Sequence, residues 1–173
     1  MKKLIEIKKK LAGDWFKFLQ TEMVKQFQLL ENETSKKNKK QTKYFVKRQW
    51  EKKNKKEGGG TSCLLSGGEI FDKIGINQST VSGQFLKKFR SKILGAEKNG
   101  KYWASGISVV AHMKNPKIPA FHFNTRFIVT SKSWFGGGMD ATPSSNDKKE
   151  KNFIHQKLKT VCKLNNKNYN KYK

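Results

Sequence analysis

The stretch Pro119–Arg126, PAFHFNTR, decides how the rest of the sequence is interpreted, because its side chains alternate between polar and aromatic. With the two-residue period of a β-strand, one face carries three polar side chains, namely His122, Asn124 and Arg126. The other face carries Phe121, Phe123 and Phe127. An imidazole, an amide and the last of three arginines on one face favour a ligand-binding surface. An ordinary half-exposed strand would show the same alternation, and this alternative stays open.

The preceding stretch, Tyr102–His112 (YWASGISVVAH), shows the same two-residue period. Ser108 and His112 share one face of this predicted strand. The connection to the next strand contains Asn115-Pro116, a dipeptide typical of turns, so we expect two adjacent antiparallel strands. Their polar faces would then form one surface, carrying two of the three histidines of the chain: Ser108, His112, His122, Asn124 and Arg126.

Apolar residues that recur every three or four positions predict an amphipathic helix over Ile5–Leu30. We expect this helix to pack its apolar stripe on the sheet: Ile7, Leu11, Trp15, Phe18, Leu19, Met23, Phe27 and Leu30. The lysine-rich tract Glu31–Lys43 and the polar end, residues 165–173, are expected to be mobile. A second amphipathic helix is predicted over Lys148–Leu164.

Short strands account for most of the remaining chain. They are predicted at Tyr44–Trp50, Thr61–Leu65, Glu69–Lys73 and Ile76–Val81, with a helix at Phe85–Leu94 and a glycine-relaxed backbone in Trp134–Pro143, WFGGGMDATP. The strands outnumber the helices and do not alternate with them. This order predicts a single domain over residues 1–173 with an α+β fold, an antiparallel β-sheet flanked by helices.

The composition bears on the class of ligand and on location. The formal net charge of +25 is typical of nucleic-acid-binding proteins, but only three of the 38 basic residues are arginine. Base and phosphate recognition relies on the arginine fork, so we interpret the lysines mainly as solvated charge. A lysine-rich nucleic-acid-binding module remains the alternative function, and a chain that does not fold stably is a third possibility. Two cysteines and no long apolar segment predict a cytoplasmic protein without a membrane span.

Five segments, taken in order, resemble oxygen-dependent coproporphyrinogen oxidase, in a form similar to alphaproteobacterial members. They are Trp50 followed by Glu57–Ser62 (EGGGTS), Gly67–Gly83 (GGEIFDKIGINQSTVSG), Gly106–His112 (GISVVAH), Asn115–Phe127 (NPKIPAFHFNTRF) and Trp134–Pro143 (WFGGGMDATP). The likeness extends from the first helix to the last residues. Members of the family continue past the position equivalent to residue 173, so the chain is expected to be truncated and to form an incomplete version of the family fold.

The resemblance implies an oxidoreductase of haem biosynthesis. Its reaction is the oxidative decarboxylation of two propionates of coproporphyrinogen to give protoporphyrinogen, with molecular oxygen as co-substrate and no organic cofactor. The two glycine runs, Gly58–Gly60 and Gly136–Gly138, are consistent with the absence of an organic cofactor. Neither run has the glycine spacing of a phosphate loop or of a dinucleotide fold. A homodimer is also implied, although most of its interface would lie beyond the end of this chain. Truncation leaves the activity of this chain open.

The resemblance also implies roles for individual residues. His122 matches the proposed proton donor, and the substrate-binding positions are Ser108, Asn124, Thr125 and Arg126. Asp140 is the second candidate catalytic residue, as an orienter of a histidine or a pyrrole N–H, and a turn-capping aspartate is the alternative. Three histidines match positions proposed for a divalent metal: His112, His122 and His155. Histidines that only form hydrogen bonds are the alternative to a metal site.

Overall fold

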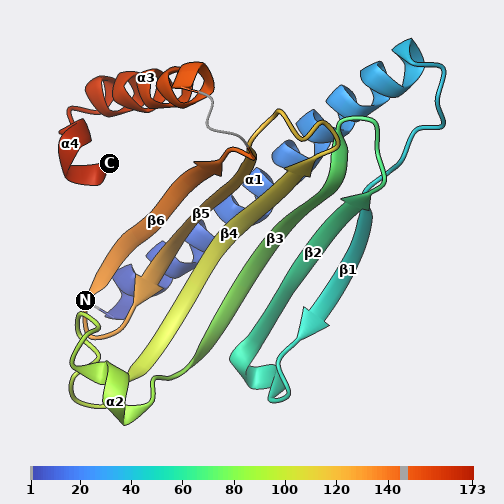
Figure 1. The fold of residues 1–173 in the computed structure, drawn as a ribbon. Helices are drawn as coiled ribbons and strands as arrows, with labels where there is room; N and C mark the ends of the chain where they lie inside the picture. Colours follow the sequence, from blue (N-terminus) through green and yellow to red (C-terminus); the bar gives the residue numbers. More distant parts are fainter. Residues whose placement is uncertain (1, 145–147) are drawn as a thin grey trace.

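The residues with alternating polarity form a six-stranded antiparallel sheet in the order β1-β2-β3-β4-β5-β6 (Figure 1). The computed structural model describes residues 2–144 and 148–173. The strands are β1 (Val46–Glu51), β2 (Gly58–Ser66), β3 (Phe71–Gln84), β4 (Lys101–Met113), β5 (Ala120–Val129) and β6 (Ser133–Thr142). The helices are α1 (Lys2–Lys37), α2 (Lys87–Arg90), α3 (Lys148–Leu164) and α4 (Tyr169–Tyr172), with a 3₁₀ turn η1 at Lys55–Glu57. Each strand pairs with its neighbour along the chain, and the predicted α+β class is confirmed.

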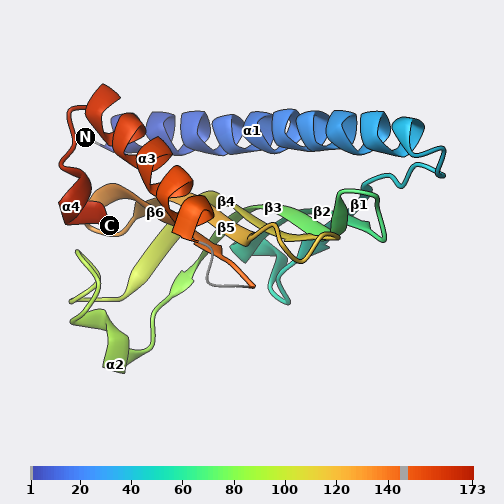
Figure 2. The ribbon, with the colours of Figure 1, turned by 45° about the horizontal axis from the view of Figure 1, so that its top comes forward.

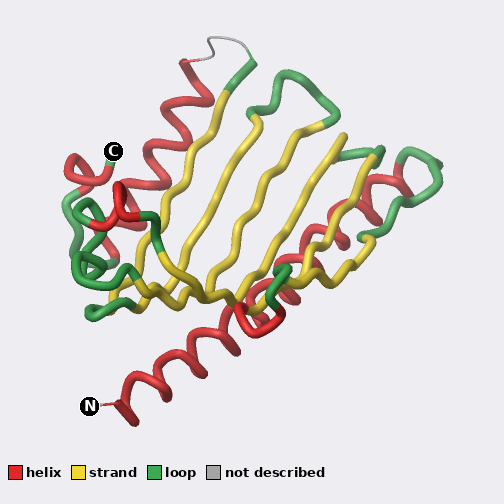
Figure 3. Tube along the Cα trace, turned by 90° about the horizontal axis from the view of Figure 1, so that it is seen from below, coloured by secondary structure: helices red, strands yellow, loops and turns green. Residues whose placement is uncertain are grey.

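The hydrophobic core lies between α1 and one face of the sheet (Figure 2). Figure 2 also shows the segment around α2 projecting from the other side of the sheet. The most deeply buried apolar side chains are Phe16, Leu65, Phe71, Ile74, Ile76 and Val109. We call the face under α1 the covered face and the opposite one the open face. The six strands lie side by side across the sheet (Figure 3), so each contributes alternate side chains to both faces.

The apolar stripe predicted for the first helix is partly wrong. Leu11, Trp15 and Phe18 are 64%, 52% and 55% exposed, whereas Phe16 is only 1% exposed. Apolar residues occupy more than one side of α1, so periodicity alone does not say which side packs on the sheet. The side that faces the core carries Ala12, Phe16, Leu19, Met23 and Phe27.

The tract Glu31–Lys43 was expected to be a loop, but α1 continues through it to Lys37. Glu31 is fully buried, and its carboxylate accepts hydrogen bonds from the backbone N–H groups of Glu69, Ile70 and Phe71. The distances from Ile70 N and Phe71 N to Glu31 Oε2 are 3.0 and 3.4 Å. A buried carboxylate that satisfies backbone donors at the β2–β3 turn explains why the helix extends beyond its apolar repeat.

Other predicted elements also need correction. The two strands expected at Glu69–Lys73 and Ile76–Val81 form the single strand β3, in which Gly75 pairs with both neighbouring strands. The glycine-rich stretch Trp134–Pro143 is not relaxed but forms most of β6. Only Lys87–Arg90 of the helix predicted at Phe85–Leu94 is helical.

At the C-terminal end of the chain, α3 has the predicted bounds. It is followed by α4, which forms within the expected mobile end, and the mobility of that end stays a prediction. In Figure 1, α3 and α4 lie beside the β6 edge of the sheet. Among residues 2–144 and 148–173, no helix combines the length and apolar character needed to cross a bilayer.

Candidate active site on the open face

The polar row predicted from PAFHFNTR lies on the open face. In the pairing of β4 with β5, Ser108 stands opposite Asn124, and Val110 stands opposite His122. His122 is exposed, whereas Phe127 is buried in the core on the covered face. The two-residue period therefore gave the correct faces of both strands, and Ser108, Asn124 and His122 share one surface.

The His122 imidazole lies beside two further titratable groups. Strand β6 places Asp140 directly opposite His122, and the distance from His122 Nδ1 to Asp140 Oδ1 is 3.3 Å. The ring of His112, on β4, lies 6.4 Å from the His122 ring, measured between centroids. A carboxylate at Nδ1 favours the tautomer that carries its proton there, and it leaves Nε2 available for proton transfer with a ligand. Asp140 is thus placed in a strand, where it can orient His122, and not in a turn.

The Arg126 guanidinium is positioned by the neighbouring amide and by two glycines. Arg126 Nη2 donates to Asn124 Oδ1 at 2.7 Å, which fixes one side of the guanidinium and leaves further N–H donors for a ligand. Gly106 and Gly136 pair with Arg126 from the two sides. A Cβ on Gly106 would lie 2.7 Å from Arg126 Cβ, so β4 needs glycine here for the close approach of the two strands.

Two predicted site residues lie off the polar row, although His155 lines one hollow together with Asp140. Thr125 pairs with Ile107, a core residue, so its side chain is on the covered face, away from Asn124 and Arg126. His155 lies on α3, where its Nδ1 hydrogen-bonds the hydroxyl of Tyr169. Within the described ranges, no three metal-ligating side chains lie close enough to hold an ion. The arrangement does not fit a site formed by all three histidines, and a metal bound at these residues stays a prediction.

Sequence reasoning missed Asn77, which stands on β3 directly opposite Ser108 and extends the polar row by one strand. The available signal was the alternation of Gly75, Asn77 and Ser79 with the buried Ile74 and Ile76. That signal was overlooked because this region was interpreted as two short strands divided at Gly75.

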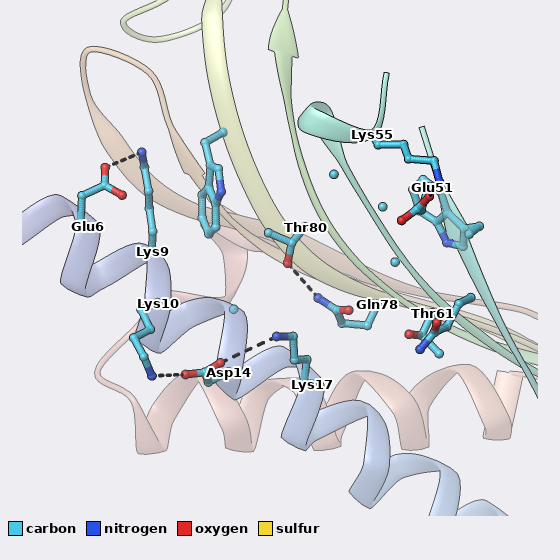
Figure 4. Close-up of a pocket in the computed structure, with 17 residues that line it drawn as sticks. Glu6, Lys9, Lys10, Asp14, Lys17, Glu51, Lys55, Thr61, Gln78 and Thr80 are labelled. Atoms are coloured by element: carbon cyan, nitrogen blue, oxygen red, sulfur yellow. Dashed lines mark hydrogen bonds and ion pairs between the residues drawn. The ribbon is translucent and has the colours of Figure 1, made fainter. Parts of the chain in front are cut away.

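A hollow of about 660 Å³ lies between α1 and strands β1–β4 on the covered side (Figure 4). Its lysines are paired with carboxylates of the chain itself: Lys9 with Glu6 at 2.8 Å, Lys10 with Asp14 at 2.8 Å and Lys55 with Glu51 at 3.0 Å. The hydrogen bond from Lys10 holds the pKa of Asp14 below its ordinary value, and the same contact raises the pKa of Lys10. Because the lysines of this hollow are already paired with carboxylates, the hollow is a weaker candidate for binding an anionic ligand than the open face.

Comparison with known sequences identifies the family. A sequence model described as coproporphyrinogen III oxidase matches residues 12–173, which is most of the chain. The chain belongs to the coproporphyrinogen III oxidase family. The resemblance seen in the sequence motifs is thereby confirmed, whereas the nucleic-acid-binding alternative receives no support.

Curated relatives of this coproporphyrinogen oxidase family member include three proteins named oxygen-dependent coproporphyrinogen-III oxidase. The protein of Rickettsia felis is 46% identical over 154 residues, covering 89% of this chain and 54% of the relative. The protein of Rickettsia typhi is 45% identical over 155 residues, with the same coverage. The protein of Rickettsia rickettsii (strain Sheila Smith) is 43% identical over 166 residues, covering 95% of this chain and 58% of the relative. The chain thus spans little more than half the length of these relatives.

Proposed function

We propose that the open face binds coproporphyrinogen and that this chain takes part in its oxygen-dependent oxidative decarboxylation. The observation that supports this most directly is the contact of 3.3 Å between His122 Nδ1 and Asp140 Oδ1, on the same face of β5 as Arg126, four residues farther along the strand. A proton carrier and a carboxylate-binding group on one surface are what the removal of a propionate carboxylate requires. The names of the relatives and the family match support the same reaction.

Substrate binding is assigned to Arg126, Asn124 and Ser108. The guanidinium can hold a propionate carboxylate through two parallel hydrogen bonds, a geometry that lysine does not offer. The Asn124 side chain, which accepts the hydrogen bond from Arg126, orients this fork. Ser108 stands opposite Asn124 and adds a hydroxyl to the same row. Thr125, on the covered face, is left out of this assignment.

The reaction requires one proton for each propionate. The side chain –CH₂–CH₂–COO⁻ loses carbon dioxide, a proton from the carbon attached to the pyrrole ring and two electrons, and a vinyl group remains. Molecular oxygen accepts the two electrons and two protons to give hydrogen peroxide. One of these protons comes from the broken C–H bond, and the other is the proton consumed from outside the substrate. We assign delivery of that proton to His122, whose Nδ1 side is occupied by Asp140. Asp140 is a positioning residue, because it acts through the imidazole.

The same proposal includes three further features. They are the remaining walls of the substrate site, a homodimer and a cytoplasmic location. They rest on the likeness to relatives of which this chain spans little more than half. Size-exclusion chromatography with light scattering would test the dimer, since a particle of one chain mass, 20.0 kDa, would contradict it.

The proposal is tested by incubating the protein with coproporphyrinogen III and measuring protoporphyrin fluorescence after oxidation of the product. We expect product in air and none without oxygen. We expect His122→Gln to lower the rate about 100-fold, the lower end of the usual range for a lost proton donor. Binding of coproporphyrin III, measured separately by fluorescence quenching, should weaken about tenfold in Arg126→Gln. Neither product nor coproporphyrin binding in the unaltered protein would overturn the proposal.

A further inference from the structure

We propose that the substrate surface continues from the candidate active site across β3 and β2 to β1, where Arg48 holds a carboxylate on the opposite rim of the macrocycle. This inference rests on the proposed function and adds a second anchor to it. Arg48, on β1, lies four strands away from Arg126 on β5.

The register places one uninterrupted polar row across the open face. Asn124 pairs with Ser108, and Ser108 pairs with Asn77. The row then continues through Ser62 on β2 to Arg48 on β1. Directly paired residues of antiparallel strands point to the same side, so all five side chains belong to one face. Five consecutive strands therefore each contribute one polar side chain to a single row.

Local contacts confirm that the β1 and β2 part of this row faces the same way. A Cβ on Gly60 would lie 3.0 Å from the ring of Trp50, so Trp50 is on the open face, as is Arg48 two residues earlier. A Cβ on Gly75 would lie 3.8 Å from both Leu64 Cδ1 and Asn77 Nδ2. Arg48, Ser62 and Leu64 also line one hollow of about 410 Å³ at this end of the sheet.

The surface between the two arginines suits a flat, wide ligand. The glycines on the open face between the two arginines include Gly60, Gly75 and Gly106, and Gly136 and Gly138 continue this surface on β6. Four strand spacings separate β1 from β5, which amounts to roughly 19 Å between backbones, and each arginine side chain can reach inward from its end. A tetrapyrrole that carries propionates on all four rings has carboxylates on opposite rims, and it could contact both guanidiniums while lying flat on the glycines.

The charge of the β1 end complements a carboxylate. Arg48 is exposed, and in the part of the chain that the structure describes its guanidinium forms neither an ion pair nor a hydrogen bond. The nearest acidic residue along the strand, Glu51, is paired with Lys55. Lys43 lines the same hollow as Arg48 and adds a second positive charge. An anion at this end therefore meets two cations whose charge is not already compensated.

The experiment compares two stable porphyrins that differ in their carboxylates. Coproporphyrin III has propionates on all four rings, whereas protoporphyrin IX has two, on adjacent rings, so that its opposite rim is uncharged. Affinities would be measured by fluorescence quenching for the unaltered protein, Arg48→Gln, Lys47→Gln and Arg126→Gln. Lys47 is the matched control, because it precedes Arg48 on β1 and stands opposite Cys63, a residue of the covered face.

We expect Arg48→Gln to weaken coproporphyrin III binding about tenfold and protoporphyrin IX binding less than twofold. Lys47→Gln should change neither affinity more than twofold. Equal losses in Arg48→Gln and Lys47→Gln would show a general charge effect and overturn the inference. A loss in Arg126→Gln without a loss in Arg48→Gln would overturn the second anchor while leaving the proposed function intact. No loss in either arginine variant, or no binding by the unaltered protein, would overturn both.

Discussion

The two faces of the sheet are made by the same strands but have opposite chemistry. On the covered face, Ile76 and Val109 are fully buried against α1. On the open face, the neighbouring positions Asn77 and Ser108 are polar and reach the surface. Burial of apolar area stabilises the fold, whereas the open face contributes hydrogen-bonding groups and glycine at little gain in stability. Truncations of side chains on the covered face are therefore expected to lower stability more than truncations on the open face.

The largest effect on stability is expected from Phe16→Ala. Phe16 is 1% exposed and packs in the core between α1 and the sheet, so its truncation should lower the free energy of unfolding by about 3–5 kcal/mol. Phe18→Ala is the matched control, because Phe18 lies on the same helix and is 55% exposed. We expect that control to cost less than about 1 kcal/mol. Urea unfolding followed by circular dichroism measures both, and equal losses would contradict the assigned orientation of α1.

A smaller loss is expected from Glu31→Gln, which alters the contact between the end of α1 and the β2–β3 turn. Glutamine keeps the size of the side chain but replaces one acceptor oxygen with a donor, facing backbone N–H groups of Glu69, Ile70 and Phe71. Leaving buried donors unsatisfied should cost about 2 kcal/mol in the free energy of unfolding. Exposed Glu33, half a turn away, provides the control Glu33→Gln. A stable Glu31→Gln variant would show that the turn does not need the carboxylate.

Gly106→Ala tests whether the open face needs its glycines. The added methyl group would lie 2.7 Å from both Arg126 Cβ and Thr125 O, so β5 has to shift. We expect a loss of about 1–3 kcal/mol in the free energy of unfolding, together with weaker coproporphyrin III binding in the quenching assay. Gly138→Ala is the control on the same face, because no atom lies within 4 Å of its added methyl group. Similar stability losses in both variants would indicate a general intolerance of alanine in these strands.

The two faces also differ in how well the sequence predicts them. The alternation in Tyr102–His112 and Pro119–Arg126 was sufficient to assign both faces of β4 and β5, because a two-residue period is a local property of the chain. The contact between His122 and Asp140 was not predictable in this way. It depends on β6 pairing with β5, and the glycines of WFGGGMDATP suggested a relaxed backbone and not a strand.

Contacts between distant segments explain the other differences. The buried carboxylate of Glu31 looks like one more charge in a lysine-rich tract until the β2–β3 turn is placed beside it. Which side of α1 is buried depends on the sheet beneath it, so Trp15 and Phe18 were assigned to the core although both are exposed. Arg48 and Asn77 join the polar row only through the register of three strand pairs. Period and composition predicted the elements, and register determined the site.

On the open face, Asp140→Asn should affect catalysis and not stability. The amide cannot compensate an imidazolium at Nδ1, so we expect the rate of protoporphyrin formation to fall about tenfold, which corresponds to ~1.4 kcal/mol in activation free energy. Because Asp140 is exposed, the urea midpoint should change little. Asp72→Asn, at an exposed carboxylate on β3, is the control. An unchanged rate in Asp140→Asn would remove Asp140 from the mechanism.

The smallest effect is expected at the corner that joins the covered face to the β2–β3 turn. The hydrogen bond from the Lys114 ammonium, and then that from Asn38 Nδ2 at 3.0 Å, hold the pKa of Glu69 below its usual range. The folded state therefore binds a proton less readily than the unfolded chain, whose glutamate titrates near its ordinary value of about 4.3. Stability from this contact is fully present above that value and is lost as the pH falls through the lowered folded-state pKa.

Replacing Glu69 with glutamine should remove the loss of stability at low pH that comes from this contact. Melting temperatures would be measured from neutral pH down to about pH 3, where glutamate is largely protonated in an unfolded chain. The gap between the unaltered protein and Glu69→Gln should be small at neutral pH, because the pair is near the surface, and it should close on acidification. Added salt should reduce the neutral-pH gap by screening the Lys114 charge. A gap that widened toward low pH would mean that Glu69 has a raised pKa in the folded protein, which the contacts with Lys114 and Asn38 oppose.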